Sequence, residues 1–416
     1  MKSHLINFCQ LFYLSFITAL LLSTDLNAQG PNYDKVLKEV NSVRTEYEKN
    51  IGRKIPSLNV LIQTPADYIF VSSVPEGNTP VTKDTYFRFA SNTKNFTSAS
   101  ILKMQQDGWL DIKSKIIDNI PGSTAPYIPD TPEFNIPYKN EITIELLLQH
   151  AAGVYDVDND SVPGYNGLSY VDYMMYKDPS HQYELSELVN QDAVHKLSFF
   201  PPGKGYHYSN TGFTMLSEII ERVYTLKSST KKYYSDYVKD HITGSAAPVP
   251  LDISFPYLAS DVSMPLPFVK GLMLSKDTNV TFTNVNMSAH VGEGNGIGTM
   301  ADINKYIRTL MKGENVLNKS SIELMKHTVS DSNKTYALGC FYIKDLGYGH
   351  NGCIKGYLSL MMYDPDTDVS LIVMLPENDY TIAEDEESII KGLKAIVNAG
   401  FAARLALGYS GKLISY

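Results

Sequence analysis

The chain has 416 residues, a net charge of −9 and a pI near 5.5, and 43% of its residues are hydrophobic. This apolar content is enough for a globular core, and at about 150 residues per domain the length predicts two to three structural units. No basic cluster offsets the acidic balance, so nucleic acid is not an expected partner.

The N-terminus reads as a signal peptide. Lys2 gives a positive start, residues 11–22 form an apolar run too short to span a bilayer comfortably, and Leu26-Asn27-Ala28 precedes a cleavage point before Gln29. We therefore predict a signal peptide over 1–28 and an exported protein, periplasmic or secreted. An uncleaved anchor is the alternative. No later stretch predicts a membrane span.

The first part of the mature chain predicts a charged helix over 33–51 and a hairpin of strands over 58–62 and 68–74. A second helix follows a short apolar segment and stops at Gly108, and Ser91 is either its first residue or the residue just before it.

The middle of the chain predicts short helices between irregular segments. The expected helices cover 143–150, with Thr143 as the N-cap, 185–197 and 213–223. The segment 116–140 is expected to be irregular, the pattern over 155–176 supports no assignment, and 242–286 is polar with little periodicity.

The last part predicts a glycine-rich loop, a helix, four antiparallel strands and a closing helix. These elements cover 292–299, 301–311, 336–344, 348–352, 358–364, 369–375 and 384–406. We therefore expect one α+β domain over 29–416, with an α/β part from about 29–95 and 290–416 and a mostly helical region from about 96–289.

Ser91 and Lys94 are the first candidate site residues. Positions i and i+3 share a helix face with Cβ atoms about 5–6 Å apart, so the lysine amine can reach the serine hydroxyl. A serine needs a base to become a nucleophile, and burial or a helix dipole can destabilise the ammonium enough to make lysine that base. The same spacing occurs at Ser100/Lys103, Ser228/Lys231 and Ser388/Lys391, where a solvated helix face is the simpler interpretation.

Two later segments contain further candidate site residues. Tyr208-Ser209-Asn210 stands before a helix after a Pro-Pro-Gly loop, and His350-Asn351-Gly352 opens a strand. In the order Ser-x-x-Lys, Tyr-x-Asn and His-x-Gly, the chain resembles penicillin-binding-protein-like serine hydrolases of the class C β-lactamase and D-Ala-D-Ala carboxypeptidase type.

This resemblance implies a β-lactamase/transpeptidase-like fold, an antiparallel sheet flanked by helices with a helical region beside the site. It also implies roles for the motif residues. Ser91 would attack the carbonyl, Lys94 and Tyr208 would share proton transfer, and Asn210 would bind Lys94 and the substrate amide. His350 would line the pocket opposite, and Gly352 would leave room for substrate to lie along the strand edge. The backbone N–H groups of Ser91 and Cys353 would form the oxyanion hole.

The third motif departs from that of β-lactamases because it has His350 in place of lysine, and the strand over 336–342 carries no arginine. An unperturbed histidine, with a pKa of about 6.5, is mostly neutral at pH 7.5. We therefore expect slow β-lactam turnover, activity on small esters, and capture of carboxylated peptides that strengthens towards pH 6.

The leading hypothesis is a serine hydrolase acting on a small amide, peptide or ester, D-Ala-D-Ala carboxypeptidase-like. The alternatives are an esterase of the same fold or a cell-wall-fragment or β-lactam binding protein without turnover.

No cofactor is expected, and neither His150 nor His207 has a metal-ligand spacing that supports a site. The sequence leaves the substrate and the oligomeric state open. Cys340 and Cys353 flank a hairpin, and free thiols are favoured over a disulfide between them.

Overall fold

The computed structural model describes residues 30–275, 279–328, 335–380 and 387–416. The predicted signal peptide lies outside these residues, as do the first residues of the predicted closing helix. In the described part of the chain, no helix is both long and apolar enough to cross a membrane.

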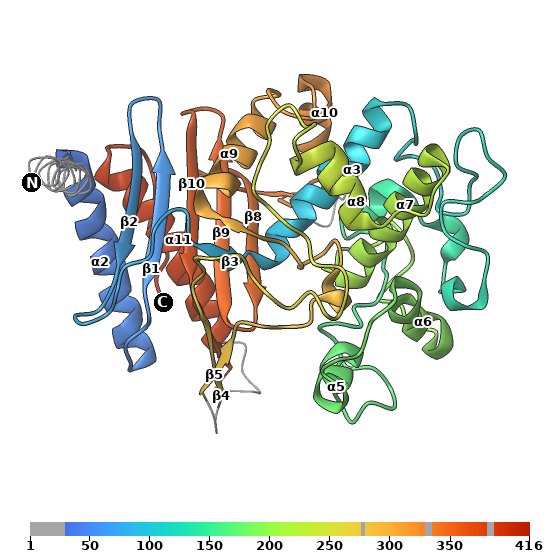
Figure 1. Cartoon of the computed structure of the whole chain (residues 1–416), viewed down its shortest axis with the longest axis horizontal. Coiled ribbons are helices and arrows are strands. Elements are labelled where there is room, and N and C mark those ends of the chain that lie inside the picture. Colours follow the sequence, from blue (N-terminus) through green and yellow to red (C-terminus); the bar gives the residue numbers. More distant parts are fainter. Residues whose placement is uncertain (1–29, 276–278, 329–334, 381–386) are drawn as a thin grey trace, which may run out of the picture.

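A six-stranded antiparallel sheet lies at the centre, in the order β2-β1-β10-β9-β8-β7 (Figure 1). Its strands are Leu58–Gln63 (β1), Tyr68–Ser73 (β2), Phe341–Ile343 (β7), Gly347–Ile354 (β8), Tyr357–Asp364 (β9) and Val369–Leu375 (β10). The N-terminal hairpin joins the C-terminal strands where β1 pairs with β10, with Val60 opposite Val373. The two ends of the chain therefore build one sheet.

Both faces of the sheet are covered, and for this reason β9 and β10 are buried along their whole length. Alternate β9 residues enter two different cores: Leu360 packs with the helices Pro31–Ile51 (α2) and Glu387–Ala406 (α11), and Met361 packs with the opposite core. The helices Met300–Met311 (α9) and Thr93–Gln106 (α3) contribute to that second core.

A mostly helical region follows α3 and lies to one side of the sheet (Figure 1). Its helices are Ile144–Leu148 (α4), Tyr170–Lys177 (α5), Leu185–His195 (α6), Asn210–Ser228 (α7), Tyr234–Val238 (α8) and the π-helix Lys239–Thr243 (η4), and Lys319–Met325 (α10) comes later in the chain. Short 3₁₀ turns cover Ala90–Asn92 (η1), Pro132–Phe134 (η2), Lys139–Glu141 (η3) and Ser288–His290 (η5). The predicted N-cap of α4 is confirmed, since the Thr143 hydroxyl accepts a hydrogen bond from the Leu146 N–H.

Several elements differ from the sequence-based expectation. The segment 242–286 contains two strands, Gly271–Ser275 (β4) and Asn279–Phe282 (β5), which form a small sheet with Glu377–Tyr380 (β11). Tyr86–Arg88 (β3) pairs with Ile297–Thr299 (β6) in a second small sheet. These strands are too short to give an alternating pattern, and their partners are distant in sequence.

Cys340 is buried before β7 and Cys353 is partly buried on β8, and neither takes part in a disulfide. The register pairs Phe341 with Gly349, which places Cys353 beyond the paired part of β7. The two cysteines are therefore not joined, which was the favoured alternative.

Candidate active site

Ser91 lies in η1, the single 3₁₀ turn that leads from β3 into α3. The preceding residue, Ala90, adopts a left-handed conformation with φ of 52°, which is uncommon for a residue with a side chain. This sharp turn brings the chain directly from the β3–β6 pair into the helix. Lys94 follows on the first turn of α3, and its Nζ atom lies 3.2 Å from the Ser91 Oγ atom.

Strand β8 packs directly against this turn at Gly352. A Cβ atom at Gly352 would lie 2.2 Å from the Phe89 carbonyl oxygen and 3.1 Å from the Ala90 Cβ. The protein itself therefore fills the space that glycine leaves. The family resemblance had suggested that substrate would use this space, and that expectation is wrong. The close approach sets Cys353, the next residue on β8, beside Ser91 in the wall of the cavity.

The Lys94 side chain is fully buried and donates to three further oxygen atoms. These acceptors are Asn210 Oδ1 at 2.6 Å, the Glu293 carbonyl at 2.9 Å and Glu293 Oε2 at 3.1 Å. Burial alone would lower the pKa of Lys94, but the neighbouring Tyr208 and Glu293 outweigh burial, so the pKa is raised. The expectation of a destabilised ammonium is therefore wrong for the resting site.

Glu293 is the first residue of the site that sequence reasoning missed. It belongs to the glycine-rich segment before β6, and its Oε1 atom accepts a hydrogen bond from His290 Nδ1 at 2.6 Å. The same imidazole nitrogen lies 3.4 Å from Asp158 Oδ2, which in turn accepts from Asn210 Nδ2 at 2.6 Å.

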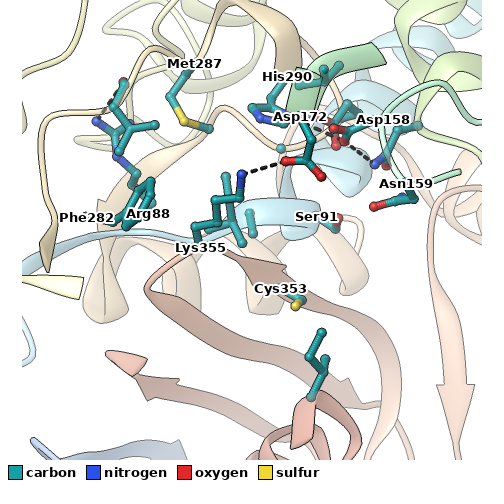
Figure 2. A pocket seen from close by; sticks show the side chains of 18 of the residues that line it. Arg88, Ser91, Asp158, Asn159, Asp172, Phe282, Met287, His290, Cys353 and Lys355 are labelled. Atoms are coloured by element: carbon teal, nitrogen blue, oxygen red, sulfur yellow. Dashed lines mark hydrogen bonds and ion pairs between the residues drawn. The ribbon is translucent and has the colours of Figure 1, made fainter. Parts of the chain in front are cut away.

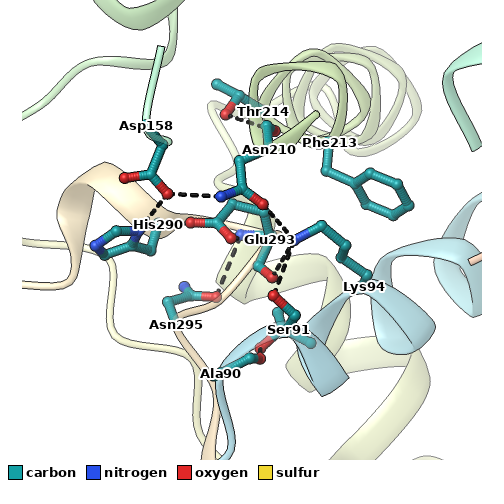
Figure 3. Close-up of polar contacts among 12 residues, drawn as sticks. Ala90, Ser91, Lys94, Asp158, Asn210, Phe213, Thr214, His290, Glu293 and Asn295 are labelled. Carbon is teal, nitrogen blue, oxygen red and sulfur yellow. Dashed lines mark hydrogen bonds and ion pairs between the residues drawn. The ribbon is translucent and has the colours of Figure 1, made fainter. Parts of the chain in front are cut away.

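These contacts close a ring that starts and ends at Lys94 (Figure 3). Its members, in order, are Lys94, Asn210, Asp158, His290 and Glu293. Burial would lower the pKa of His290, but the two adjacent carboxylates raise it to about 10, so the imidazole is charged at neutral pH. Two cations and two anions therefore alternate around the ring, with the amide of Asn210 between one cation and one anion.

Tyr208 lies on the other side of Lys94, with its ring centroid 4.8 Å from the ammonium and 4.2 Å from the His150 ring. Burial raises the pKa of the Tyr208 phenol, and Lys94 together with a hydrogen bond to Ser91 offsets only part of that effect. The phenol is therefore protonated at neutral pH, although Lys94 makes it easier to ionise than burial alone would allow.

His350 does not line the cavity. Its Nδ1 atom donates to the Asn351 carbonyl at 2.5 Å, and its Nε2 atom lies 3.0 Å from the Tyr336 hydroxyl. Burial, with a further contribution from Lys94, lowers the pKa of His350 to about 3. The expectation that His350 gains charge near pH 6 and captures a carboxylate is therefore wrong, because the imidazole stays neutral throughout that range.

A cavity of about 670 Å³ opens above Ser91. Lys355, just after β8, spans it to α5 through an ion pair, with its Nζ atom 2.6 Å from Asp172 Oδ1 (Figure 2). Both side chains keep solvent contact, with 30% and 48% of their surface exposed. Lys355 is a cation of the cavity wall that sequence reasoning missed, because it lies outside the three motifs.

Asp158, His290 and Glu293 each bring one ligand atom to within 4.8 Å of the others, a spacing that a metal ion can also use. In this structure His290 Nδ1 lies between the two carboxylates, 2.6 Å from Glu293 Oε1 and 3.4 Å from Asp158 Oδ2. An imidazolium has no free lone pair at that nitrogen, so the arrangement fits an ion-pair network.

Comparisons with known proteins identify a family that matches most of the chain. The sequence profile of the Beta-lactamase family matches residues 44–388. Penicillin-binding protein 4* of Bacillus subtilis (strain 168) is 27% identical over 163 residues, which make up 39% of this chain and 29% of that protein. A probable fimbrial assembly protein FimD, serogroup H1, of Dichelobacter nodosus is 30% identical over 172 residues, 39% of this chain and 38% of that protein. The matched part thus spans about a third of these relatives.

Solved structures with the same fold cover nearly the whole chain. The D-amino acid amidase of Ochrobactrum anthropi SV3, complexed with D-phenylalanine, has a TM-score of 0.66 at 20% identity, over 90% of this chain and all of that one. A D-stereospecific amidohydrolase from Streptomyces sp. has a TM-score of 0.64 at 21% identity, over 86% and 98%. The octameric penicillin-binding protein homologue of Pyrococcus abyssi has a TM-score of 0.64 at 20% identity, over 90% of this chain and 78% of that one. At these identities the likeness establishes the fold, as the resemblance of the motifs predicted.

Proposed function

This chain belongs to the Beta-lactamase family, and from that premise we propose that it is a serine hydrolase that forms an acyl-enzyme at Ser91. One observation carries the proposal: the Ser91 hydroxyl lies 3.2 Å from the Lys94 amine at the base of a 670 Å³ cavity. A nucleophile and a proton-transfer group within hydrogen-bond reach of each other are the minimum arrangement for nucleophilic catalysis.

The proposed reaction has two stages. Ser91 Oγ bonds to the substrate carbonyl carbon and loses its proton to Lys94 in its amine form, and the leaving amine or alcohol departs with a proton from Lys94 or Tyr208. Water then cleaves the resulting ester and restores the hydroxyl. The backbone N–H groups of Ser91 and Cys353 are the proposed donors to the oxyanion.

The proposed substrate is a small amide, peptide or ester. The structural neighbours named as a D-amino acid amidase and a D-stereospecific amidohydrolase favour an amino-acid amide or short peptide. The cavity can also receive an anionic group, because Lys355 lies in its wall and is partly exposed. A carboxylated peptide is therefore included among the candidate substrates, alongside esters.

Export to the periplasm or the medium is part of the same proposal. It rests on Lys2, the apolar run over 11–22 and the cleavage pattern before Gln29. N-terminal sequencing of the protein from its native host tests it, with Gln29 as the expected first residue.

A substrate panel tests the function, with Ser91→Ala as the control. The panel is a D-amino-acid amide, a D-Ala-D-Ala peptide and a short-chain p-nitrophenyl ester. We expect the wild-type protein to turn over at least one of them and to carry a covalent adduct in intact-mass spectra, both absent from Ser91→Ala. An adduct without turnover would assign the chain to the non-hydrolytic binding proteins, and hydrolysis by Ser91→Ala would contradict the serine mechanism.

A further inference from the structure

We propose that Glu293 is the proton acceptor behind the Ser91–Lys94 pair: it takes a proton from Lys94 so that the amine can take one from Ser91. This inference rests on the proposed function and adds a residue that lies outside the three motifs. A proton acceptor for Lys94 is needed because a lysine held as an ammonium cannot accept the serine proton.

Glu293 is placed for this task by direct contact. Its Oε2 atom lies 3.1 Å from Lys94 Nζ, and the same nitrogen lies 3.2 Å from Ser91 Oγ. Only 3% of the Glu293 side chain and none of the Lys94 side chain is exposed. Lys94 is thus a common neighbour of the hydroxyl that must lose a proton and of a carboxylate that can receive one.

The proton balance of the step is simple. One proton moves from Lys94 Nζ to Glu293 Oε2, which converts an ammonium and a carboxylate into an amine and a carboxylic acid. The summed charge of the pair is zero before and after. A buried ion pair carries a large desolvation cost, so a dry site favours the neutral form more than water does. A substrate that displaces water from the cavity therefore assists the transfer.

The amine then completes acylation. Its lone pair takes the Ser91 proton while the bond from Oγ to the substrate carbonyl carbon forms, which regenerates the ammonium beside the oxyanion. When the bond to the leaving group breaks, Lys94 or Tyr208 supplies the proton that the leaving group needs. Glu293 returns its proton to the site during deacylation, so no external acid or base is consumed.

The rest of the ring keeps Glu293 in place. His290 binds Oε1 at 2.6 Å and leaves Oε2 directed at Lys94 (Figure 3). The titratable groups that face the pair are His290 and Asp158 in the ring, Asp156 behind Asn210, Tyr208, and the buried imidazoles of His150 and His350. Both buried imidazoles have lowered pKa values and are neutral at pH 7, so they do not compete for the proton.

The test is the pH profile of Ser91 phosphonylation by a fluorophosphonate, in which Ser91 Oγ bonds to phosphorus and fluoride leaves, so the rate reports Ser91 reactivity without substrate specificity. The matched control is Glu145→Gln. Glu145, a buried residue of α4 away from the cavity, pairs with Lys113 at 2.6 Å, so this variant also removes a glutamate from a lysine. For Glu293→Gln we expect phosphonylation at pH 7 to slow about a hundredfold, the scale of a general base. The acidic limb of the pH profile should also move to higher pH by more than about one unit, since the reaction then needs the free amine of Lys94. Glu145→Gln should keep the wild-type profile.

Glu293→Asp provides the rescue. It keeps a carboxylate, so it should retain the wild-type acidic limb at a rate about tenfold lower. A wild-type pH profile, or faster phosphonylation at neutral pH, in Glu293→Gln would overturn the inference. If Glu293→Gln fails to fold, Glu293→Asp alone decides the test. A wild-type rate in Glu293→Asp, or an acidic limb that moves to another pH, would then overturn the inference. Absence of label on wild-type Ser91 at every pH would contradict the proposed function instead.

Discussion

Asp158 accepts a hydrogen bond from the side-chain amide of Asn210, with 2.6 Å between Oδ2 and Nδ2. This contact fixes which end of the amide faces Lys94, because the NH₂ group is committed to the carboxylate and only the oxygen is left for the ammonium. A loop carboxylate that does not touch Lys94 therefore determines how the lysine is held.

Asp158→Asn should weaken catalysis through this orientation. An asparagine can donate as well as accept, so the Asn210 amide can flip and present NH₂ to Lys94. Loss of one hydrogen bond to a charged group corresponds to about a tenfold to hundredfold change. We expect kcat/KM to fall by that factor while the unfolding temperature stays close to wild type. An unchanged kcat/KM would show that Asn210 needs no partner.

Tyr208→Phe and Lys94→Ala should each lower acylation by at least about a hundredfold, the usual scale for acid–base groups. The phenol is protonated at neutral pH, so Tyr208→Phe should affect amide substrates more than activated esters, whose leaving groups need no proton. Stopped-flow acylation of matched amide and ester substrates measures both effects. Near-native acylation of amides in the two variants would place the proton-transfer groups elsewhere.

The charge on His290 should make part of the free energy of unfolding depend on pH. Its pKa is raised to about 10 in the folded protein from about 6.5 in an unfolded chain. A raised pKa gives stability that is fully present below about pH 6.5 and is lost as pH rises to about 10. We therefore expect the gap in urea midpoint between wild type and His290→Gln to be largest near pH 6 and to shrink towards pH 10. A gap that is constant over this range would mean that the imidazole is neutral in the folded protein.

Lys355 should favour substrates that carry a carboxylate. Its ammonium is paired with Asp172 but partly exposed, so a substrate carboxylate can replace or join that partner. Lys355→Ala should lower the ratio of kcat/KM for a carboxylated peptide to that for a neutral ester by about tenfold, the value of one charge-assisted contact. Lys113→Ala removes another ion-paired lysine and should not alter the ratio.

The same ratio in the wild-type protein should stay flat between pH 6 and 7.5, because His350 is neutral in this range. A ratio that rises towards pH 6 would indicate a titrating cation in the cavity other than Lys355.

The parts of the site that sequence predicts are those encoded by local geometry. Ser91 and Lys94 lie three residues apart at a helix start, so their contact follows from the helix itself. The ring partners Asp158, His290 and Glu293 come from two loops more than 120 positions apart, and only the tertiary fold brings them together. A single sequence contains no periodic signal for such a meeting.

His350 shows an error of another kind. Strand alternation puts His350 on the same face of β8 as Gly352, the face that packs against the Ser91 turn. Its imidazole is nevertheless buried there, because it contacts the Tyr336 hydroxyl and lies 6.2 Å from the Tyr208 ring. The motif therefore placed His350 near the site, but the packing of aromatic side chains distant in sequence keeps it out of the cavity wall.

The central claim is that Ser91 is the nucleophile, and labelling with a fluorophosphonate followed by tryptic peptide mapping tests it most directly. Cleavage after Arg88 and Lys94 releases residues 89–94, in which Ser91 is the one serine. We expect the label on Ser91 in this peptide and at least about a hundredfold slower labelling in Lys94→Ala. Label on Ser100, Ser228, Ser388 or another residue, with Ser91 unmodified, would contradict the account.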